Sequence, residues 1–269
     1  MRCSRRLKYG VKLSAGLGPV NLQTNGSLAE QDVDCTMRQG INKLPLWSLK
    51  MVVKLSGKST GVSNDLKKRI SELGCIFIHI PKCAGNAVQQ SLFGDIVFGH
   101  QTVRQYQLGL PRDTYRKAWK FTITRDPWER IVSAWRFLKA GGYHENDSKY
   151  FSETLSQYTT FDHFVNDWLV YQDLDQCGCT HFKTQLHYLR NLRGEVAMDS
   201  IIKLSDLSDE YPELRNRLGG DELKVHNKTE GEDIDYRKFY NSNETLKNIS
   251  TIYAEDIQEL SYAPNPNLG

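Results

Sequence analysis

CIFIHIPKCAG, residues 75–85, passes from an apolar run directly into a turn that carries Lys82 and Gly85. The run is short, β-branched and aromatic, which is typical of a buried parallel strand. Residues 87–93 have the composition of a helix, and Gly94 ends it. Backbone N–H groups of such a loop point at an anion, and Lys82 adds a positive charge. The stretch predicts a phosphate-binding strand–loop–helix, although an ordinary turn with a surface lysine shares the pattern.

A second strand-like run, residues 120–124, leads into RDPWERIVSAW, residues 125–135. The early proline suits the first turn of a helix, and the apolar residues after it share one face. We expect Arg125 at the carboxyl end of the strand and Ser133 about two helical turns later, facing the same crevice. A guanidinium and a hydroxyl together suit a second phosphate. The competing interpretation is that Arg125 and Asp126 only cap a helix.

The two stretches resemble the cofactor-binding signatures of sulfotransferases that use 3′-phosphoadenosine 5′-phosphosulfate (PAPS), in the branch of carbohydrate, Golgi-type enzymes that act on heparan- and chondroitin-like chains. The resemblance runs from about Cys75 to Ala263 and includes weaker signals at residues 201–207, 225–229 and 253–256. It implies that the first loop holds the 5′-phosphosulfate and that the second stretch holds the 3′-phosphate. The cofactor-binding residues it implies are Lys82, Cys83, Ala84, Gly85, Asn86, Ala87, Arg125, Ser133 and Lys228.

The first loop departs from the family pattern, in which hydroxyl residues usually follow the lysine. Here Cys83 and Ala87 stand at two of those positions. Backbone donors survive any change of side chain, so we expect phosphate binding to persist with weaker affinity or lower activity. A thiolate activated by Lys82 is one interpretation of Cys83, and a small packed thiol is the favoured one.

Transfer of a sulfuryl group to a hydroxyl requires a base for the hydroxyl proton and a cation for the leaving oxygen. Lys82 is the predicted cation, without need of a metal. Among seven histidines, His100 follows an expected short strand at residues 96–98 and precedes a helix at 102–106. In the carbohydrate sulfotransferases that the chain resembles, a histidine after the second strand is the usual base, which makes His100 the predicted base.

The other histidines and the cysteines leave alternatives open. His79 alternates with apolar residues and is expected in the core, whereas His181 or His187 is available to contact the substrate. Cys177, Cys179 and His181 suggest zinc, but the spacing is unusual and no second pair follows. We favour a loop with free thiols or a disulfide elsewhere, and we expect no metal.

Composition is that of a globular enzyme: 269 residues, 39% hydrophobic, 25% charged and a net charge of +3. Residues 1–70 are expected to form a flexible arm with at most a short docking helix near 44–53, and residues 71–269 the sulfotransferase domain. Neither a membrane span nor a signal peptide is evident. We expect a soluble, cytoplasmic protein, with the Golgi lumen or membrane as the alternative.

The predicted fold is α/β, a P-loop-type three-layer sandwich with a central, mainly parallel sheet flanked by helices. The predicted function is transfer of sulfuryl from PAPS to a hydroxyl, with a carbohydrate or other hydroxyl compound as partner and no nucleic acid. Residues 141–160, polar and rich in tyrosine, either shape the acceptor cleft or form a solvated loop. One alternative is a nucleotide kinase or NTPase, although the chain lacks G-x-x-x-x-G-K-[ST]. Another is a protein that binds the nucleotide with little turnover.

Overall fold

A computed structural model describes residues 45–55, 59–175, 177–223 and 235–265. Within these ranges a parallel sheet has the order β1-β2-β3. Its strands are β1 (Cys75–Ile78), β2 (Trp119–Thr124) and β3 (Ser200–Lys203). Residues Phe77 and Phe121 pair across β1 and β2, and their rings stack with centroids 4.9 Å apart. The predicted α/β fold with a parallel sheet is confirmed.

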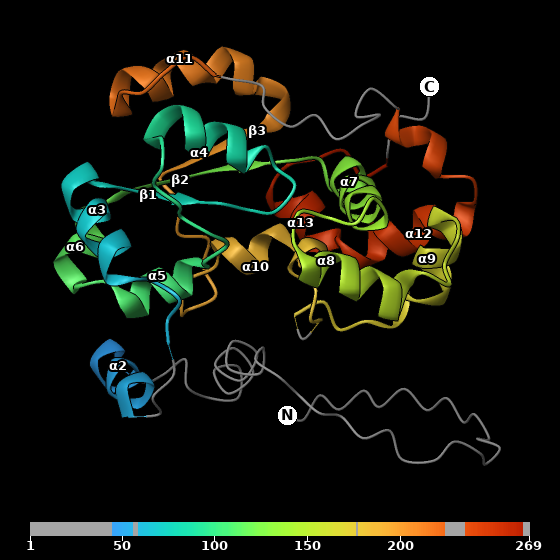
Figure 1. Ribbon diagram of the computed structural model, residues 1–269, viewed down its shortest axis with the longest axis horizontal. Coiled ribbons are helices and arrows are strands. Elements are labelled where there is room, and N and C mark those ends of the chain that lie inside the picture. Colours follow the sequence, from blue (N-terminus) through green and yellow to red (C-terminus); the bar gives the residue numbers. More distant parts are fainter. Residues whose placement is uncertain (1–44, 56–58, 176, 224–234, 266–269) are drawn as a thin grey trace, which may run out of the picture.

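Helices cover both faces of the sheet, as an all-parallel sheet requires. Helices α4 and α11 lie above it, and α5 and α10 lie below it (Figure 1). The bounds of the helices around the sheet are α3 (Asn64–Leu73), α4 (Gly85–Phe93), α5 (Val103–Gly109), α6 (Arg112–Lys117), α10 (Gln185–Leu189) and α11 (Leu207–Leu218).

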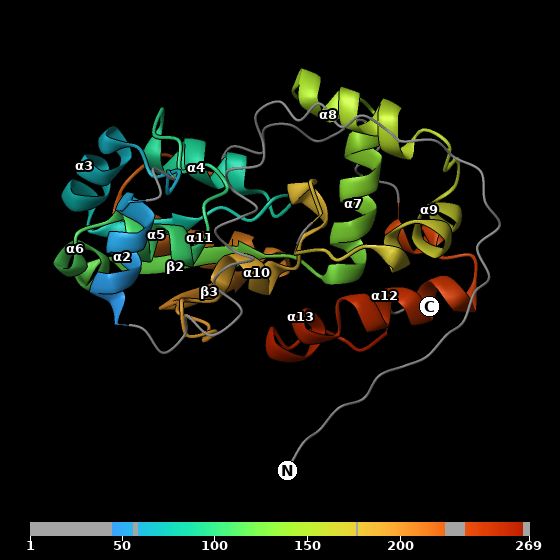
Figure 2. The same cartoon turned by 90° about the horizontal axis from the view of Figure 1, so that it is seen from below.

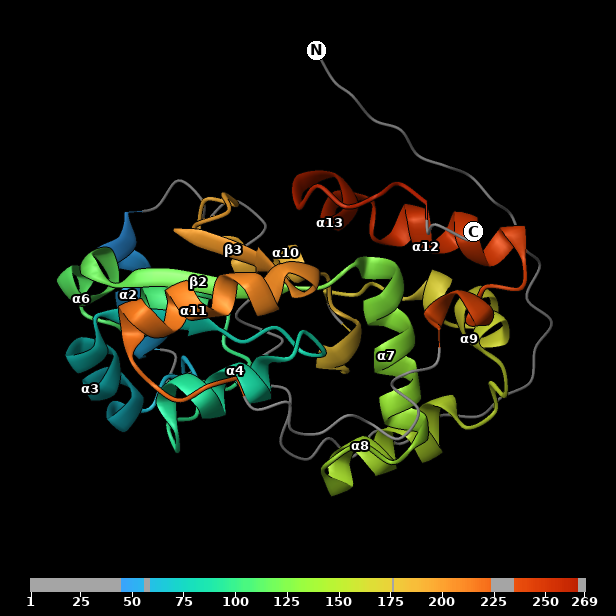
Figure 3. The ribbon, with the colours of Figure 1, turned by 90° about the horizontal axis from the view of Figure 1, so that it is seen from above.

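A second group of helices lies beyond the carboxyl end of β2, as Figure 3 shows from above. Its members are α7 (Pro127–Lys139), α8 (Glu145–Tyr150), α9 (Phe161–Asp167), α12 (Asn243–Ile252) and α13 (Ala254–Glu259). Shorter turns of helix are Phe151–Leu155, Leu169–Tyr171, Thr180–Phe182, Leu204–Asp206 and Tyr236–Phe239. Lys82 and Arg125 follow β1 and β2, whose carboxyl ends face this second group.

The helix boundaries agree with the local chemistry of the sequence. Gly94 ends α4, and Pro127 opens α7 after Asp126, whose side chain accepts a hydrogen bond from the N–H of Trp128. Thr102 caps α5 through a reciprocal pair of hydrogen bonds with Gln105.

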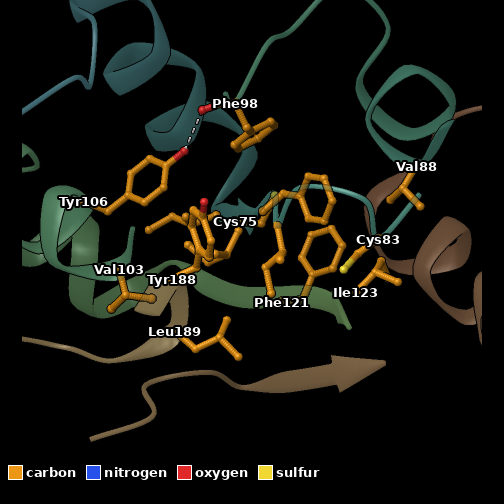
Figure 4. Packing of buried hydrophobic residues seen from close by; sticks show 14 of the residues in the cluster. Cys75, Cys83, Val88, Phe98, Val103, Tyr106, Phe121, Ile123, Tyr188 and Leu189 are labelled. Carbon is orange, nitrogen blue, oxygen red and sulfur yellow. Dashed lines mark hydrogen bonds between the residues drawn. The ribbon is translucent and has the colours of Figure 1, made fainter. Parts of the chain in front are cut away.

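Two clusters of buried apolar side chains stabilise the fold. The first fills the space between the sheet and its covering helices and includes Phe98, Tyr106 and Tyr188 (Figure 4). The second joins α7, α9, α12 and α13 around Trp128 and Trp135. Burial of one such large side chain contributes roughly 1.5–3 kcal/mol. The site thus lies where two separately packed cores meet.

The expected strand at residues 96–98 is wrong. This segment has no regular secondary structure, and side chains form hydrogen bonds with the backbone of Phe98. The N–H of Phe98 donates to Gln89 Oε1 (2.8 Å), and its carbonyl accepts from the Tyr106 hydroxyl (3.1 Å). Val97 is 68% exposed, which a buried strand would not allow. The apolar composition of the segment reflects the anchoring of Phe98 in the core and does not indicate pairing in the sheet.

Helix α2 (Leu46–Leu55) lies where a docking helix was expected, and it packs on the sheet domain through α5. Leu49 is buried, and Lys50 Nζ donates to the carbonyl of Leu110 over 2.6 Å. In Figure 2 this helix lies in front of α5 and β2. The remainder of the expected arm, residues 1–44, lies outside the described residues. None of the described helices is long and apolar enough to cross a membrane.

Candidate active site

The loop after β1 holds two non-glycine residues in the left-handed backbone region. Lys82 has φ 67° and Ala84 has φ 56°. Such conformations cost on the order of 1–3 kcal/mol each, so surrounding contacts must hold them. Ala84 is also the N-cap of α4 but makes no side-chain cap hydrogen bond. The first turn of α4 therefore lacks the usual side-chain acceptor at its cap, a geometry that suits an anion.

Gly85 opens α4 because a larger residue would not fit against His79. A Cβ at position 85 would lie 1.9 Å from His79 Cδ2. The His79 side chain is buried and stacks on Phe77 with ring centroids 5.7 Å apart. Burial lowers the pKa of His79 to about 3, with a smaller contribution from His100. The prediction that His79 belongs to the core is confirmed, and its ring supports the loop from below.

Arg125 connects the two predicted phosphate-binding stretches. Its Nη1 donates both to Ser133 Oγ and to the backbone carbonyl of Lys82, each over 3.2 Å. Its Nη2 pairs with Glu129 Oε1 over 2.7 Å. Arg125 Nε is buried without a hydrogen-bond partner. An unsatisfied donor next to a hydroxyl fits a phosphate oxygen, because buried guanidinium N–H groups normally have acceptors.

Arg130, from the same stretch, is a buried positioning residue that sequence reasoning missed. It is 1% exposed, and its Nε donates to the carbonyl of Pro81 over 3.1 Å. Its Nη2 donates to the carbonyls of Lys183 (2.7 Å) and His181 (3.3 Å). Its charge stabilises the fully buried carboxylate of Asp256. The sequence did contain one indication of this role, because Arg130 lies among the apolar residues of α7 that face the protein interior.

Gln185 holds the backbone of Arg125 through two hydrogen bonds. Its Oε1 accepts from the N–H of Arg125 (2.9 Å), and its Nε2 donates to the carbonyl of the same residue (2.8 Å). Asp256 in turn accepts from the N–H groups of Gln185 and Leu186 at 2.7 and 3.0 Å. This network places the Arg125 side chain at the carboxyl end of β2.

A model of the sulfotransferase family matches residues 72–263. The chain belongs to the sulfotransferase family. No curated protein and no solved structure matches it. The match covers both predicted phosphate-binding stretches and the strand-to-helix turn after β3, so the motifs and the fold agree.

In this sulfotransferase, Lys82 Nζ lies 3.9 Å from the centroid of the Phe137 ring, a cation–π distance. The His181 ring packs on the same Phe137 ring, and the two centroids lie 4.9 Å apart. His181 Nε2 contacts Asp147 Oδ1 over 3.4 Å, and His181 Nδ1 is buried without a hydrogen-bond partner. The structure therefore brings one of the two alternative substrate-contacting histidines to the lysine.

His100 presents the geometry of a base. Its Nδ1 lies 2.9 Å from the carbonyl of His79, so Nδ1–H donates and Nε2 keeps its lone pair. His100 is exposed at the surface, yet the protein around its ring removes enough water that desolvation lowers its pKa from 6.5. The hydrogen bond to His79 opposes this shift, and the charge of His181 adds to it. His100 is therefore neutral at neutral pH.

The remaining predicted loop residues differ in exposure. Cys83 is fully buried, its Sγ lies 3.5 Å from Gln185 Oε1, and burial raises its pKa to about 11. The packed thiol is confirmed, and the activated thiolate is wrong, because desolvation outweighs the nearby arginines. Asn86 is exposed and Ala87 is half-buried on the first turn of α4. Lys228 lies outside the described residues.

His187 and the two later cysteines have their own contacts. His187 Nδ1 pairs with Asp175 Oδ1 over 3.1 Å. Cys177 and Cys179 are buried free thiols, and Cys177 Sγ lies 3.7 Å from the Tyr150 hydroxyl. Within the described ranges no three histidine, cysteine or acidic side chains gather as metal ligands.

Proposed function

We propose that this sulfotransferase moves a sulfuryl group from PAPS to a hydroxyl of a carbohydrate by in-line displacement. The observation that carries the proposal is the position of Arg125, which joins Ser133 to the backbone of Lys82 and keeps a buried unpaired Nε. Two anion-binding elements held together match a nucleotide with phosphates at both its 5′ and 3′ positions.

The donor would supply the sulfuryl group and a phosphate leaving group. The backbone N–H groups at the start of α4, with Lys82, would hold its 5′ end, and Arg125 and Ser133 its 3′-phosphate. Lys228 remains a further predicted contact to the nucleotide.

The protein residues divide the chemistry between a cation and a base. As the acceptor oxygen bonds to sulfur, the bond from sulfur to the bridging oxygen breaks and leaves negative charge on the phosphate. Lys82 stabilises that charge, and Phe137 below its Nζ limits the orientations of the ammonium group. The acceptor hydroxyl gives its proton to Nε2 of His100, the nitrogen that does not bind the carbonyl of His79.

A second candidate function is nucleotide binding with little turnover, favoured by the absence of hydroxyl side chains at Cys83 and Ala87. The two functions are separated by incubating the protein with labelled PAPS and a panel of glycans and small alcohols, with magnesium present and then chelated. Transfer that survives chelation supports the sulfotransferase. Tight binding of the desulfated nucleotide (PAP) without transfer supports the binding protein, and dependence on magnesium supports phosphoryl-transfer chemistry.

A further inference from the structure

The segment between α7 and α8 is built around one carboxylate. Gly142 has φ +66°, and a Cβ there would lie 2.1 Å from Asp147 Cβ. Asp147 Oδ2 accepts from the N–H groups of Tyr143 (3.1 Å) and His144 (3.2 Å), while Oδ1 faces His181 Nε2. Only glycine allows this approach, so the chain is shaped to hold Asp147 in one position.

Asp147 stays ionised over the physiological range. The hydrogen bond from His181 lowers its pKa to about 2, the two backbone N–H groups add to this, and partial burial opposes it. Its charge also contributes to the pKa of His100, so the carboxylate lies within electrostatic range of the proposed base. A carboxylate has more acceptor positions than these donors fill, and it remains able to accept from a ligand hydroxyl.

An exposed aromatic ring lies beside the same residues. Tyr143 is 57% exposed, and its ring packs edge-on against Phe137 with centroids 5.0 Å apart and planes at 71°. Phe137 is the ring that carries Lys82 Nζ and contacts His181. Tyr143 and Lys82 thus contact the same Phe137 ring, and the exposed part of the Tyr143 ring is an apolar surface that a ligand can cover.

We propose that Tyr143 and Asp147 form the acceptor site and that the acceptor is a pyranose ring. A pyranose has an apolar C–H face, which stacks on Tyr143, and hydroxyls on its rim, one of which donates to Asp147. An aromatic surface with one fixed polar group is the usual composition of a small-ligand site. This inference rests on the proposed function, because Lys82 and His100 define where the reacting hydroxyl must lie.

The test uses the full chain and measures binding of the acceptor and binding of the donor nucleotide separately. Neutral oligosaccharides of hexose and N-acetylhexosamine are added to the protein–PAP complex, and saturation-transfer NMR reports contact with the sugar C–H groups. Tyr143→Ala is compared with Tyr143→Phe and with Tyr171→Ala, a control at a tyrosine that is 77% exposed elsewhere. Asp147→Asn keeps the shape of the side chain and removes its charge, and PAP affinity is measured calorimetrically for each variant.

We expect Tyr143→Ala and Asp147→Asn to weaken sugar binding by about tenfold or more, which corresponds to about 1.4 kcal/mol, while PAP affinity stays within twofold of wild type. Tyr143→Phe and Tyr171→Ala should bind sugar as wild type does. Unchanged sugar binding in Tyr143→Ala, or no sugar bound by the wild-type complex, would overturn the acceptor site while leaving donor binding intact. Failure of the wild type to bind PAP would instead contradict the proposed function.

Discussion

The guanidinium of Arg125 donates to the backbone carbonyl of Lys82 over 3.2 Å, so the residue after β2 holds the loop after β1. Arg130 repeats this contact one residue earlier in the loop, at the carbonyl of Pro81. The left-handed conformation of Lys82 is thus supported by hydrogen bonds from two arginines of the second stretch. The two phosphate-binding stretches act as one structural unit, and a change in one is expected to affect both ends of the nucleotide.

Arg125→Ala is expected to remove most of the preference for PAP over ADP. The wild type should favour PAP because ADP lacks the 3′-phosphate that Arg125 and Ser133 are proposed to bind, and charged hydrogen bonds of this kind contribute about 1.5–3 kcal/mol. Arg125→Lys should not restore the preference, because an ammonium group lacks the separate Nε and Nη2 donors that the guanidinium offers beside Nη1. Calorimetry with both nucleotides checks this, and equal affinity of the wild type for the two would contradict the cofactor assignment.

Lys82→Ala is expected to lower turnover by roughly 10² or more and to weaken PAP binding much less. The positive charge of Lys82 stabilises the transition state most strongly, when the leaving oxygen becomes negative, and PAP binding does not reproduce that state. Single-turnover kinetics with labelled donor and PAP titration measure the two effects. Lys139→Ala, at an exposed lysine that lies over Trp135, is the matched control. A folded Lys82→Ala protein with normal turnover would show that the loop does not serve the chemistry.

The strands, the loop and the start of α7 were predictable because each depends on local signals. An apolar run followed by glycine, or an aspartate followed by proline, determines backbone conformation over a few residues. The prediction that Arg125 and Ser133 face the same crevice followed from helical spacing, and the 3.2 Å between Arg125 Nη1 and Ser133 Oγ agrees with it. These parts of the site required no knowledge of distant contacts.

Other parts could not be predicted, because they depend on residues far apart in the chain. Arg130 holds two distant segments together by donating hydrogen bonds to the carbonyls of Pro81 and Lys183. No local sequence pattern shows which carbonyls a side chain will bind. Residues 96–98 resembled a strand because Phe98 is a core anchor, and its backbone partners come from α4 and α5. The pairing of Asp147 with His181 likewise joins a polar segment to one 34 residues later.

Arg130→Met is expected to destabilise the fold by about 3 kcal/mol, because it removes three hydrogen bonds to carbonyls and leaves Asp256 buried without its cation. Urea unfolding measures this loss. Combining Arg130→Met with Asp256→Asn should recover part of it, since the uncompensated charge is gone. Strictly additive losses in the double variant would contradict the electrostatic coupling of the two side chains.

His79 is expected to make stability fall in mild acid. Its folded pKa of about 3 lies below the unfolded value of 6.5, so between these values the unfolded chain binds the extra proton. The free energy of unfolding should therefore decrease as pH falls below 6.5, by at most about 1.4 kcal/mol per pH unit from this group. Urea unfolding of wild type and His79→Leu between pH 6.5 and 4.5 tests it, and equal slopes for the two proteins would assign the acid sensitivity elsewhere.

His100→Ala is expected to abolish the acidic limb of the rate profile. The base must be neutral to accept a proton, and the pKa of His100 is lowered, so the wild-type rate should fall only at pH below 6.5. Donor affinity should stay near wild type, because the residue is proposed to face the acceptor. His163→Ala, at an exposed histidine paired with Asp167, is the control and should keep the limb. If folded His100→Ala enzyme retains substantial activity together with the acidic limb, the proton goes to another group. His181 is then the next residue to replace, since its ring packs on Phe137, over which Lys82 Nζ lies.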